Sequence, residues 1–286
     1  SVESGDTYTP VFEESGLSGA TFDIITVSDI YYPNGEVRIK SGTVVDTVTT
    51  DENGEAYTKE LFLGDYKAVE TKAPTGYVLD NSEHLVSLTY AGQEVSVTSA
   101  VTEAYNSYQN VDVTLSKYME SAPDFGIDSS DYRQYVTFGL FANEDITAAD
   151  GEIIPKDGLI EVISLNEDMT AEFHKNLPFG KYYVKELTTD EHFLLSNKKY
   201  EFEFSYRGED VPTVKIQTEK FENELKRGSV SGLKVDAEDE TGLENAVIGL
   251  FKGNETEFTN DTAIMTDTSA ADGSFGFESA PYGVYQ

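Results

Sequence analysis

Cysteine and tryptophan are absent from this chain, and basic residues are scarce: 20 Lys and Arg stand against 53 Asp and Glu, for a net charge of −33. Without Cys no disulfide can hold the fold, and this absence favours an exported protein that does not use disulfides. The charge argues against nucleic acid and anionic membrane surfaces as partners, because both would repel the chain.

The sequence also has no apolar run long enough to span a bilayer and no signal-peptide pattern at Ser1. It is therefore interpreted as an internal part of a mature protein that does not insert into a membrane. What it does have is length, 286 residues, and aromatic rings, 18 Tyr and 16 Phe. These suffice for the cores of two or three domains, so the chain is expected to fold despite its charge.

No segment has a sustained helical period, whereas short alternating strands and turns recur. Three similar blocks each follow a turn marked by Gly or Asp: "LFLGDYKAVE" (61–70), "LPFGKYYVKE" (177–186) and "SAPYGVYQ" (279–286). Their aligned glycines are Gly64, Gly180 and Gly283, which are 116 and 103 residues apart. The repeating unit therefore contains about a hundred residues of short strands.

Units of this size and pattern are typical of β-sandwiches. The sequence predicts an all-β chain of tandem immunoglobulin-like sandwiches over residues 1–110, 111–226 and 227–286, of which the third is only the N-terminal part of its unit. The connections between them are too short to be flexible linkers, so the units should stack as a semi-rigid rod.

Three polar residues repeat with the unit. Glu70 and Glu186 each lie six residues after the aligned glycine, and Asn106 and Asn223 close the first two units. A lysine follows each Asn by 11 residues, at Lys117 and Lys234.

Lys117 is predicted to point into the core. Strand alternation places it on one face with apolar neighbours, namely Val111, Val113, Leu115 and Met119. A buried ammonium is costly, so its pKa should fall, and a neutral amine is a nucleophile.

Glu186 shares a face with Tyr182 and Val184, which makes it a candidate buried carboxylic acid. In neutral form it could donate a hydrogen bond to an amide carbonyl and carry the proton of the amine to the leaving group. The electrophile would be the Asn223 carboxamide. The product would be a Lys117–Asn223 isopeptide bond, formed with loss of ammonia.

The segment "YKAVETKAPTGY" (66–77) resembles the E-box pattern YxLxETxAPxGY of Gram-positive pilins and of collagen-adhesin B-type (Cna B, SpaA-like) stalk domains, with Ala68 in place of Leu. The resemblance implies an immunoglobulin-like sandwich whose first strand supplies Lys, whose last strand supplies Asn and whose central strand supplies an assisting Glu. In the second unit these roles would belong to Lys117, Glu186 and Asn223.

The other units depart from this pattern. No Lys precedes Lys40, so the first unit has Glu70 and Asn106 without a first-strand amine; its bond either does not exist or uses a Lys upstream of Ser1. The third unit has Lys234, a possible cross-link residue, but neither Glu nor Asn to match it. Alternation does not place Asn106 or Asn223 on the apolar face, which predicts a bulge.

The resemblance implies a structural stalk of a Gram-positive adhesin or pilus, extracellular and anchored to the cell wall through a segment outside this chain. An alternative is an adhesive module in which one unit binds a host matrix protein or a glycan. No metal or cofactor is expected, because the three His lack ligand spacing and the acidic turns do not follow the EF-hand register. An enzyme is disfavoured, since the only chemistry that the sequence suggests acts once on its own chain.

Overall fold

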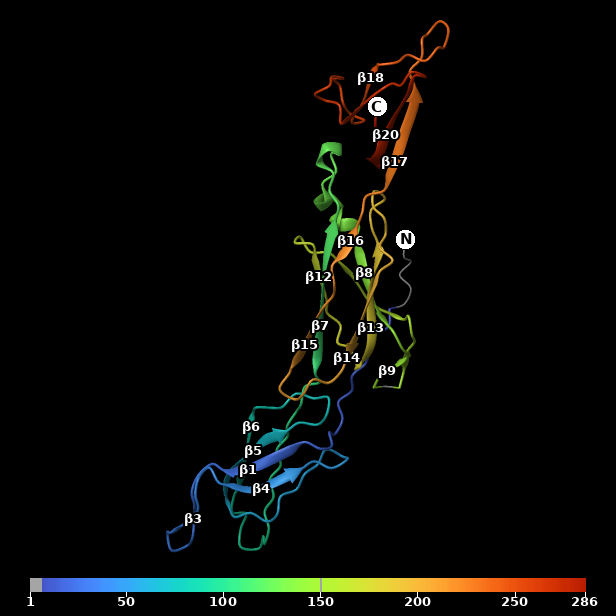
Figure 1. Cartoon of the computed structure of the whole chain (residues 1–286). Coiled ribbons are helices and arrows are strands. Elements are labelled where there is room, and N and C mark those ends of the chain that lie inside the picture. Colours follow the sequence, from blue (N-terminus) through green and yellow to red (C-terminus); the bar gives the residue numbers. More distant parts are fainter. Residues whose placement is uncertain (1–6, 150) are drawn as a thin grey trace.

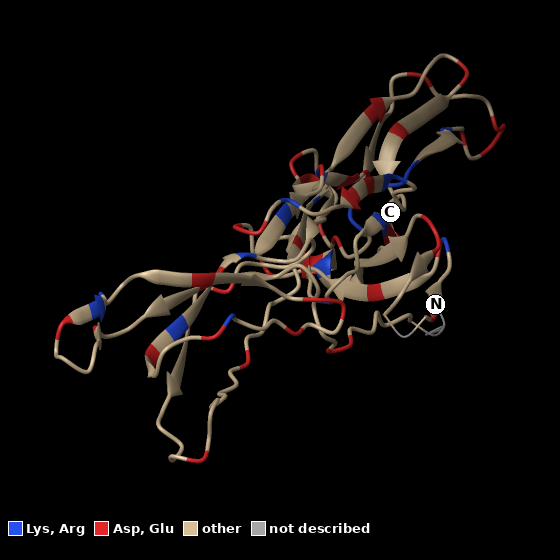
Figure 2. Cartoon of the chain, turned by 90° about the horizontal axis from the view of Figure 1, so that it is seen from below, with Lys and Arg blue, Asp and Glu red and all other residues tan. Residues whose placement is uncertain are grey.

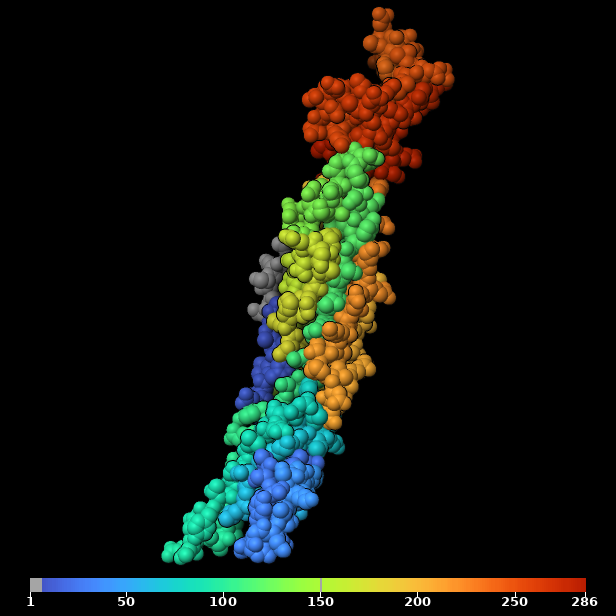
Figure 3. All heavy atoms as spheres, turned by 90° about the vertical axis from the view of Figure 1, so that its left-hand side faces the viewer, coloured from blue at the N-terminus to red at the C-terminus, as the bar shows by residue number. Residues whose placement is uncertain are grey.

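The computed structural model describes residues 7–149 and 151–286, and in these residues the chain forms twenty β-strands and two short 3-10 helices. The strands gather in three regions that follow one another along an elongated molecule (Figures 1 and 3). We call them the first unit (β1–β6), the second unit (β7–β16) and the third unit (β17–β20). The prediction of a tandem all-β sandwich chain is confirmed.

The first unit has a four-stranded antiparallel sheet in the order β4-β1-β5-β6 and a separate β2–β3 hairpin. Phe22 and Ile24 from β1 pack with Tyr66 and Ala68 from β5 on one face of the sheet. Residues 89–109 form no strand, so the described part of this unit has no counterpart of the larger second sheet that the next unit contains. The strands are β1 (Thr21–Thr26), β2 (Ile30–Tyr31), β3 (Val37–Ile39), β4 (Val44–Thr49), β5 (Gly64–Lys72) and β6 (Glu83–Leu88).

The second unit is a sandwich of two sheets. One has the order β11-β8-β13-β14, and the other has the order β12-β7-β15, with β16 also paired to β7. The elements are β7 (Asn110–Met119), η1 (Pro123–Phe125), η2 (Ser129–Tyr135), β8 (Thr137–Ala142), β9 (Ile146–Thr147), β10 (Ile153–Ile154), β11 (Leu159–Ser164), β12 (Thr170–Phe173), β13 (Gly180–Thr188), β14 (Lys199–Phe204), β15 (Thr213–Gln217) and β16 (Phe221–Asn223).

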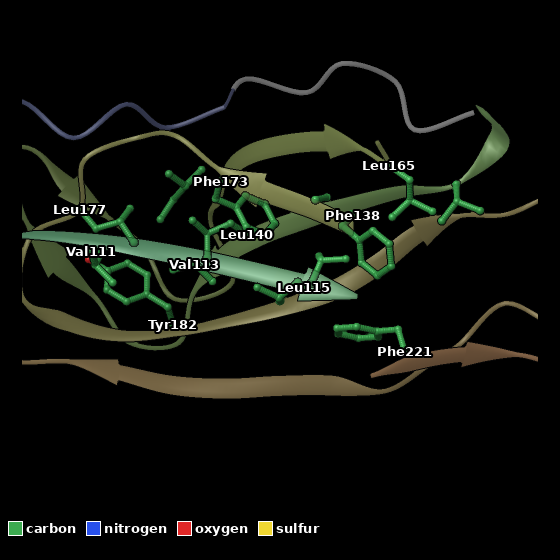
Figure 4. Packing of buried hydrophobic residues seen from close by; sticks show 14 of the residues in the cluster. Val111, Val113, Leu115, Phe138, Leu140, Leu165, Phe173, Leu177, Tyr182 and Phe221 are labelled. Carbon is green, nitrogen blue, oxygen red and sulfur yellow. The ribbon is translucent and has the colours of Figure 1, made fainter. Parts of the chain in front are cut away.

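The core of the second unit lies between these two sheets (Figure 4). Strand β7 alternates between buried and partly exposed residues, so Val113 and Leu115 face inward. They meet Phe138 and Leu140 from β8 and Tyr182 from β13, all fully buried. This alternation is the period-2 pattern of a half-buried strand, and it sets which way Lys117 points.

The third unit contains β17 (Arg227–Leu233), β18 (Val247–Leu250), β19 (Met265–Thr268) and β20 (Ser274–Pro281). Strand β17 pairs with β20, and β18 pairs with β19, both antiparallel. These pairs correspond to β7–β12 and β8–β11 of the second unit.

A tyrosine two residues after each aligned glycine supports the three-unit alignment. The hydroxyls of Tyr66, Tyr182 and Tyr285 each donate to the carbonyl oxygen of the residue four positions earlier, at 2.6 Å. Their constant spacing from the glycine is visible in the sequence but was given no role there.

Hydrogen bonds join the units at both junctions. Between the first and second units, the fully buried Gln109 side chain donates to the carbonyl oxygens of Gly208 and Val211 and accepts from the Arg207 amide. Between the second and third units, Arg227 forms an ion pair with Glu120.

Candidate cross-linking site

The second unit brings Lys117, Glu186 and Asn223 together inside the sandwich. Lys117 lies on β7, Glu186 on β13 of the opposite sheet, and Asn223 on β16, which runs parallel to β7. Their exposed fractions are 4%, 3% and 1%. Three polar side chains in an apolar core must satisfy one another, because water cannot reach them.

The three groups form a closed set of contacts. The Lys117 Nζ atom lies 2.8 Å from Glu186 Oε1 and donates to Asn223 Oδ1 at 2.5 Å. The Asn223 Nδ2 atom donates to the same Glu186 Oε1 at 2.9 Å. One carboxyl oxygen therefore contacts both the amine and the amide nitrogen.

This geometry differs in one respect from the expected role of Glu186. The sequence analysis expected its carboxyl to donate to the amide carbonyl, but Oε1 faces the nitrogen of Asn223 and the amine faces the carbonyl oxygen. The reason is the match of donors to acceptors: the amine can only donate, so it meets the carbonyl oxygen, and the amide nitrogen turns to two acceptors, Glu186 Oε1 and the Thr189 hydroxyl oxygen. The carboxyl is thus placed to act on the group that would leave.

Burial disfavours the charged form of the amine. It lowers the pKa of Lys117, an effect that the contact with Glu186 opposes without cancelling. The Nζ atom also lies 5.8 Å from the centroid of the Phe138 ring. A lowered pKa increases the fraction of neutral, nucleophilic amine at neutral pH.

Two further groups hold the site, and the sequence analysis missed both. The Thr189 hydroxyl oxygen accepts a second hydrogen bond from Asn223 Nδ2, at 2.9 Å. The backbone N–H of Ser196 donates to the other oxygen of Glu186, Oε2, at 2.8 Å. Alternation gives no signal for Thr189, because residues three apart in a strand point to opposite faces, and a register shift lies between Glu186 and Thr188. A backbone donor likewise leaves no sequence signal.

The inward position of Asn223 has a local cause. Strand β16 begins anew at Phe221, after the break that follows β15, so the two strands need not share a phase. Within β16, Phe221 and Asn223 are buried while Glu222 between them is exposed. The interruption takes the place of the expected bulge.

The first unit repeats the acid and the amide. Glu70 is 3% exposed, and its Oε2 accepts from Asn106 Nδ2 at 2.7 Å and from the Asp80 backbone N–H at 2.6 Å. Its Oε1 is buried and has no hydrogen-bond partner among the described residues. Burial raises the pKa of Glu70.

The third unit has no such site among its described residues. Lys234 follows the end of β17 and is exposed, and its amine donates to the Val235 carbonyl oxygen at 3.2 Å. The expected role of Lys234 in a cross-link therefore has no partner group in this structure.

Within residues 7–149 and 151–286, neither a metal site nor a membrane-spanning helix is found. The described residues contain no group of three or more His, Cys, Asp or Glu that could hold a metal ion. Their helices are too short and too polar to cross a bilayer.

The chain matches the family model described as "SpaA: Prealbumin-like fold domain" over residues 11–102, 135–220 and 228–286. Curated proteins give no match.

Among solved structures, the chain is similar to the Bacillus anthracis TIE protein, with 21% identity and a TM-score of 0.59, over 95% of this chain and 42% of that one. It thus spans less than half the length of that protein, and the likeness shows the fold. BcpA, the major pilin subunit of Bacillus cereus, matches with 16% identity and a TM-score of 0.30 over 94% of this chain and 82% of that one. A Streptococcal ancillary pilin matches with 20% identity and a TM-score of 0.29 over the same shares.

Proposed function

This chain belongs to the SpaA family of prealbumin-like fold domains, and from that membership we propose that it is a stalk segment of a Gram-positive surface pilus or adhesin. Its units, with limits near residues 110 and 226, hold a binding region away from the cell wall. The elongated stack of units supports this role (Figure 3). The chain has no Cys and so cannot form a disulfide, which leaves a bond that reductants do not cleave as the kind of covalent cross-link that could strengthen the stalk.

In the second unit, Lys117 and Asn223 form an isopeptide bond with help from Glu186. The neutral amine attacks Cγ of Asn223, so the Nζ–Cγ bond forms and the Cγ–Nδ2 bond breaks. One amine proton moves through Glu186 Oε1 to Nδ2, which leaves as ammonia, and the carboxyl ends as it began. The observation that supports this most directly is the position of Oε1, 2.8 Å from one nitrogen and 2.9 Å from the other.

Such a bond suits a stalk. Lys117 lies on the first strand of the second unit and Asn223 on the last, so the bond ties together the two ends of the unit. A force applied along the rod would load this bond rather than the hydrogen bonds between strands. Unlike a disulfide, an amide is not cleaved by reductants. The reaction occurs once per molecule, so the chain is not an enzyme in the sense of turnover.

The mass of the intact protein tests this proposal. The wild type should be lighter than its sequence by one ammonia, and Glu186→Gln should keep the full mass because no carboxyl carries the proton. Glu172→Gln, at an exposed position of β12, is the matched control and should lose ammonia like the wild type. A wild type of uncondensed mass would refute the bond.

A second role, recognition of a partner by the first unit, is favoured by one separate observation. Most basic side chains of that unit surround a hollow.

A further inference from the structure

The residues that line the hollow all belong to the first unit, and that unit lies at the end of the molecule away from the third unit (Figure 1). Acidic residues outnumber basic ones along the chain (Figure 2). Residues 7–106 contain only five Lys and Arg, and three of them, Arg38, Lys40 and Lys59, line this hollow. Its volume is about 420 Å³, and Leu61 and Tyr66 contribute to its apolar part. A volume of this size suits a small group such as one or two side chains.

Aromatic rings hold Arg38. Its guanidinium lies 3.3 Å from the centroid of the Phe62 ring and 4.8 Å from that of Tyr32. Contacts of this kind occupy the flat faces of the guanidinium and leave the N–H donors in its plane available. Those donors match a carboxylate, which can accept two of them at once.

The hollow keeps a positive charge. Among the described residues, neither Arg38 nor Lys40 forms an ion pair, and Lys59 has only a long contact, 3.7 Å, with Asp46. Glu60 is the one carboxylate on the wall. In a chain of net charge −33, three cations around one hollow, two of them without an ion pair among the described residues, are a local exception that would attract an anion.

The lining also limits what the anion can be attached to. The only neutral hydroxyl on the wall outside Tyr66 is that of Thr43, which already donates to the Lys40 carbonyl oxygen at 2.7 Å. A neutral sugar could hydrogen-bond to the charged side chains, but it would leave their positive charge uncompensated and would place hydroxyls against Leu61 and the other apolar residues of the wall. A peptide that carries a carboxylate next to an apolar side chain would match both the cations and the apolar surface.

We propose that this hollow is a docking site for an acidic segment of a partner polypeptide, which places an Asp or Glu carboxylate on Arg38 and Lys40 and an apolar neighbour against the wall. Arg and aromatic residues are the types that dominate binding energy at protein interfaces.

Fluorescence anisotropy of a short fluorescein-labelled peptide of alternating Glu and Leu tests the proposal. The wild type should bind it, added salt should weaken binding, and the matching peptide of alternating Gln and Leu should not bind. Arg38→Ala and Lys40→Ala should each weaken binding about tenfold, which corresponds to about 1.4 kcal/mol. Arg38→Lys should also weaken it, because the charge remains but the fork and the ring stacking are lost.

Lys72→Ala is the matched control, since it removes one charge from an exposed position of the same unit outside the hollow. It should bind like the wild type; equal losses in all three Ala variants would mean unspecific attraction and would overturn the proposal. Two other results would also overturn it. If heparin binds more tightly than the peptide and Arg38→Ala abolishes that binding, the ligand is a sulfated glycan. If the chain self-associates and Arg38→Ala abolishes the self-association, the ligand is a second copy of the chain. Unchanged melting of each variant excludes unfolding as the cause.

The docking site does not rest on the cross-link. Lys117→Met, which removes the amine in the second unit, should bind the peptide as the wild type does, so failure of one proposal leaves the other open to its own test.

Discussion

The buried carboxyls of Glu186 and Glu70 occupy the same place in two units but have different surroundings. Each accepts a hydrogen bond from the backbone N–H ten residues downstream, at Ser196 and Asp80, and each contacts an Asn side chain. Glu186 also contacts an amine, whereas the corresponding oxygen of Glu70 has no partner among the described residues. The acid and the amide therefore belong to the repeat, and the amine is what varies.

A second difference concerns the Asn nitrogen. In the second unit it donates to the Thr189 hydroxyl, three residues after Glu186. The residue three after Glu70 is Ala73, which offers no hydroxyl, and Asn106 donates instead to the Val78 carbonyl oxygen at 2.9 Å. The Asn106 amide is thus held by a backbone oxygen, whereas the Asn223 amide is held by a side-chain hydroxyl and contacts an amine.

The largest effect should come from removing the amine. Lys117→Met keeps a long side chain in the core but cannot form the bond. A cross-link that closes a loop of about 100 residues stabilises a fold by about 4–5 kcal/mol, so the second unit should melt about 15–25 °C lower. Calorimetry and intact mass together measure this.

Lys156→Ala, at an exposed position of the same unit, is the control and should melt like the wild type. If Lys117→Met also melts at the temperature of the wild type, the second unit has no stabilising bond, and an amine beside the buried acid gives it no stability that the first unit lacks.

A smaller effect is expected for Thr189→Val, which preserves shape but removes the second acceptor of the Asn223 amide. A neutral hydrogen bond contributes about 0.5–1.5 kcal/mol, so bond formation should slow about two- to tenfold. The loss of ammonia during cell-free synthesis, followed by mass, gives the rate. Thr147→Val, exposed on β9, should leave the rate unchanged, and equal rates for both variants would show that Thr189 does not position the amide.

The first unit should respond to pH through Glu70. Because burial raises the pKa of Glu70 above the ordinary value of 4.5 in the folded state, the folded state holds this proton more tightly than the unfolded chain. The contribution of Glu70 to the free energy of unfolding is therefore largest below pH 4.5, and it is lost as the pH rises through the raised pKa of the folded state. Glu70→Gln stays neutral, so it should stabilise the first unit at neutral pH and change little in acid.

Hydrogen exchange of β5, compared between variant and wild type at each pH, measures this difference. Glu94→Gln, at an exposed position, is the control and should exchange like the wild type at each pH. If Glu70→Gln slows the exchange of β5 in acid but not at neutral pH, the variant is stabilising at the wrong end of the pH range, which contradicts a raised pKa of Glu70.

Much of the fold followed from the sequence because the strands alternate and the aligned glycines recur. The inward position of Lys117 could be predicted for the same reason, since β7 is long and its apolar residues keep one phase. Short or irregular segments gave no such signal. Asn106 lies outside any strand, and Asn223 sits on a three-residue strand, so alternation could not place either.

The described part of the first unit has no counterpart of the β12-β7-β15 sheet, and this was also beyond prediction. Val95, Val97 and Val101 alternate like a strand, yet residues 89–109 form none, and these three side chains are exposed. A strand needs a hydrogen-bonded neighbour as well as a pattern, and the described part of the first unit supplies no counterpart of β7. Pairing between distant segments is the information that a local pattern lacks.

The smallest effect should be at Lys234. Its side chain is exposed, and its amine has only a weak contact with the Val235 carbonyl oxygen. Lys234→Ala should therefore change neither the loss of one ammonia from the intact mass nor the melting temperature. An amine-reactive reagent should label Lys234 in the folded protein but not Lys117, whose amine is buried and, if the bond forms, consumed. Peptide mapping after labelling distinguishes the two. Protection of Lys234 together with labelling of Lys117 would reverse the assignment, because it would mean that the exposed lysine, and not the buried one, had reacted.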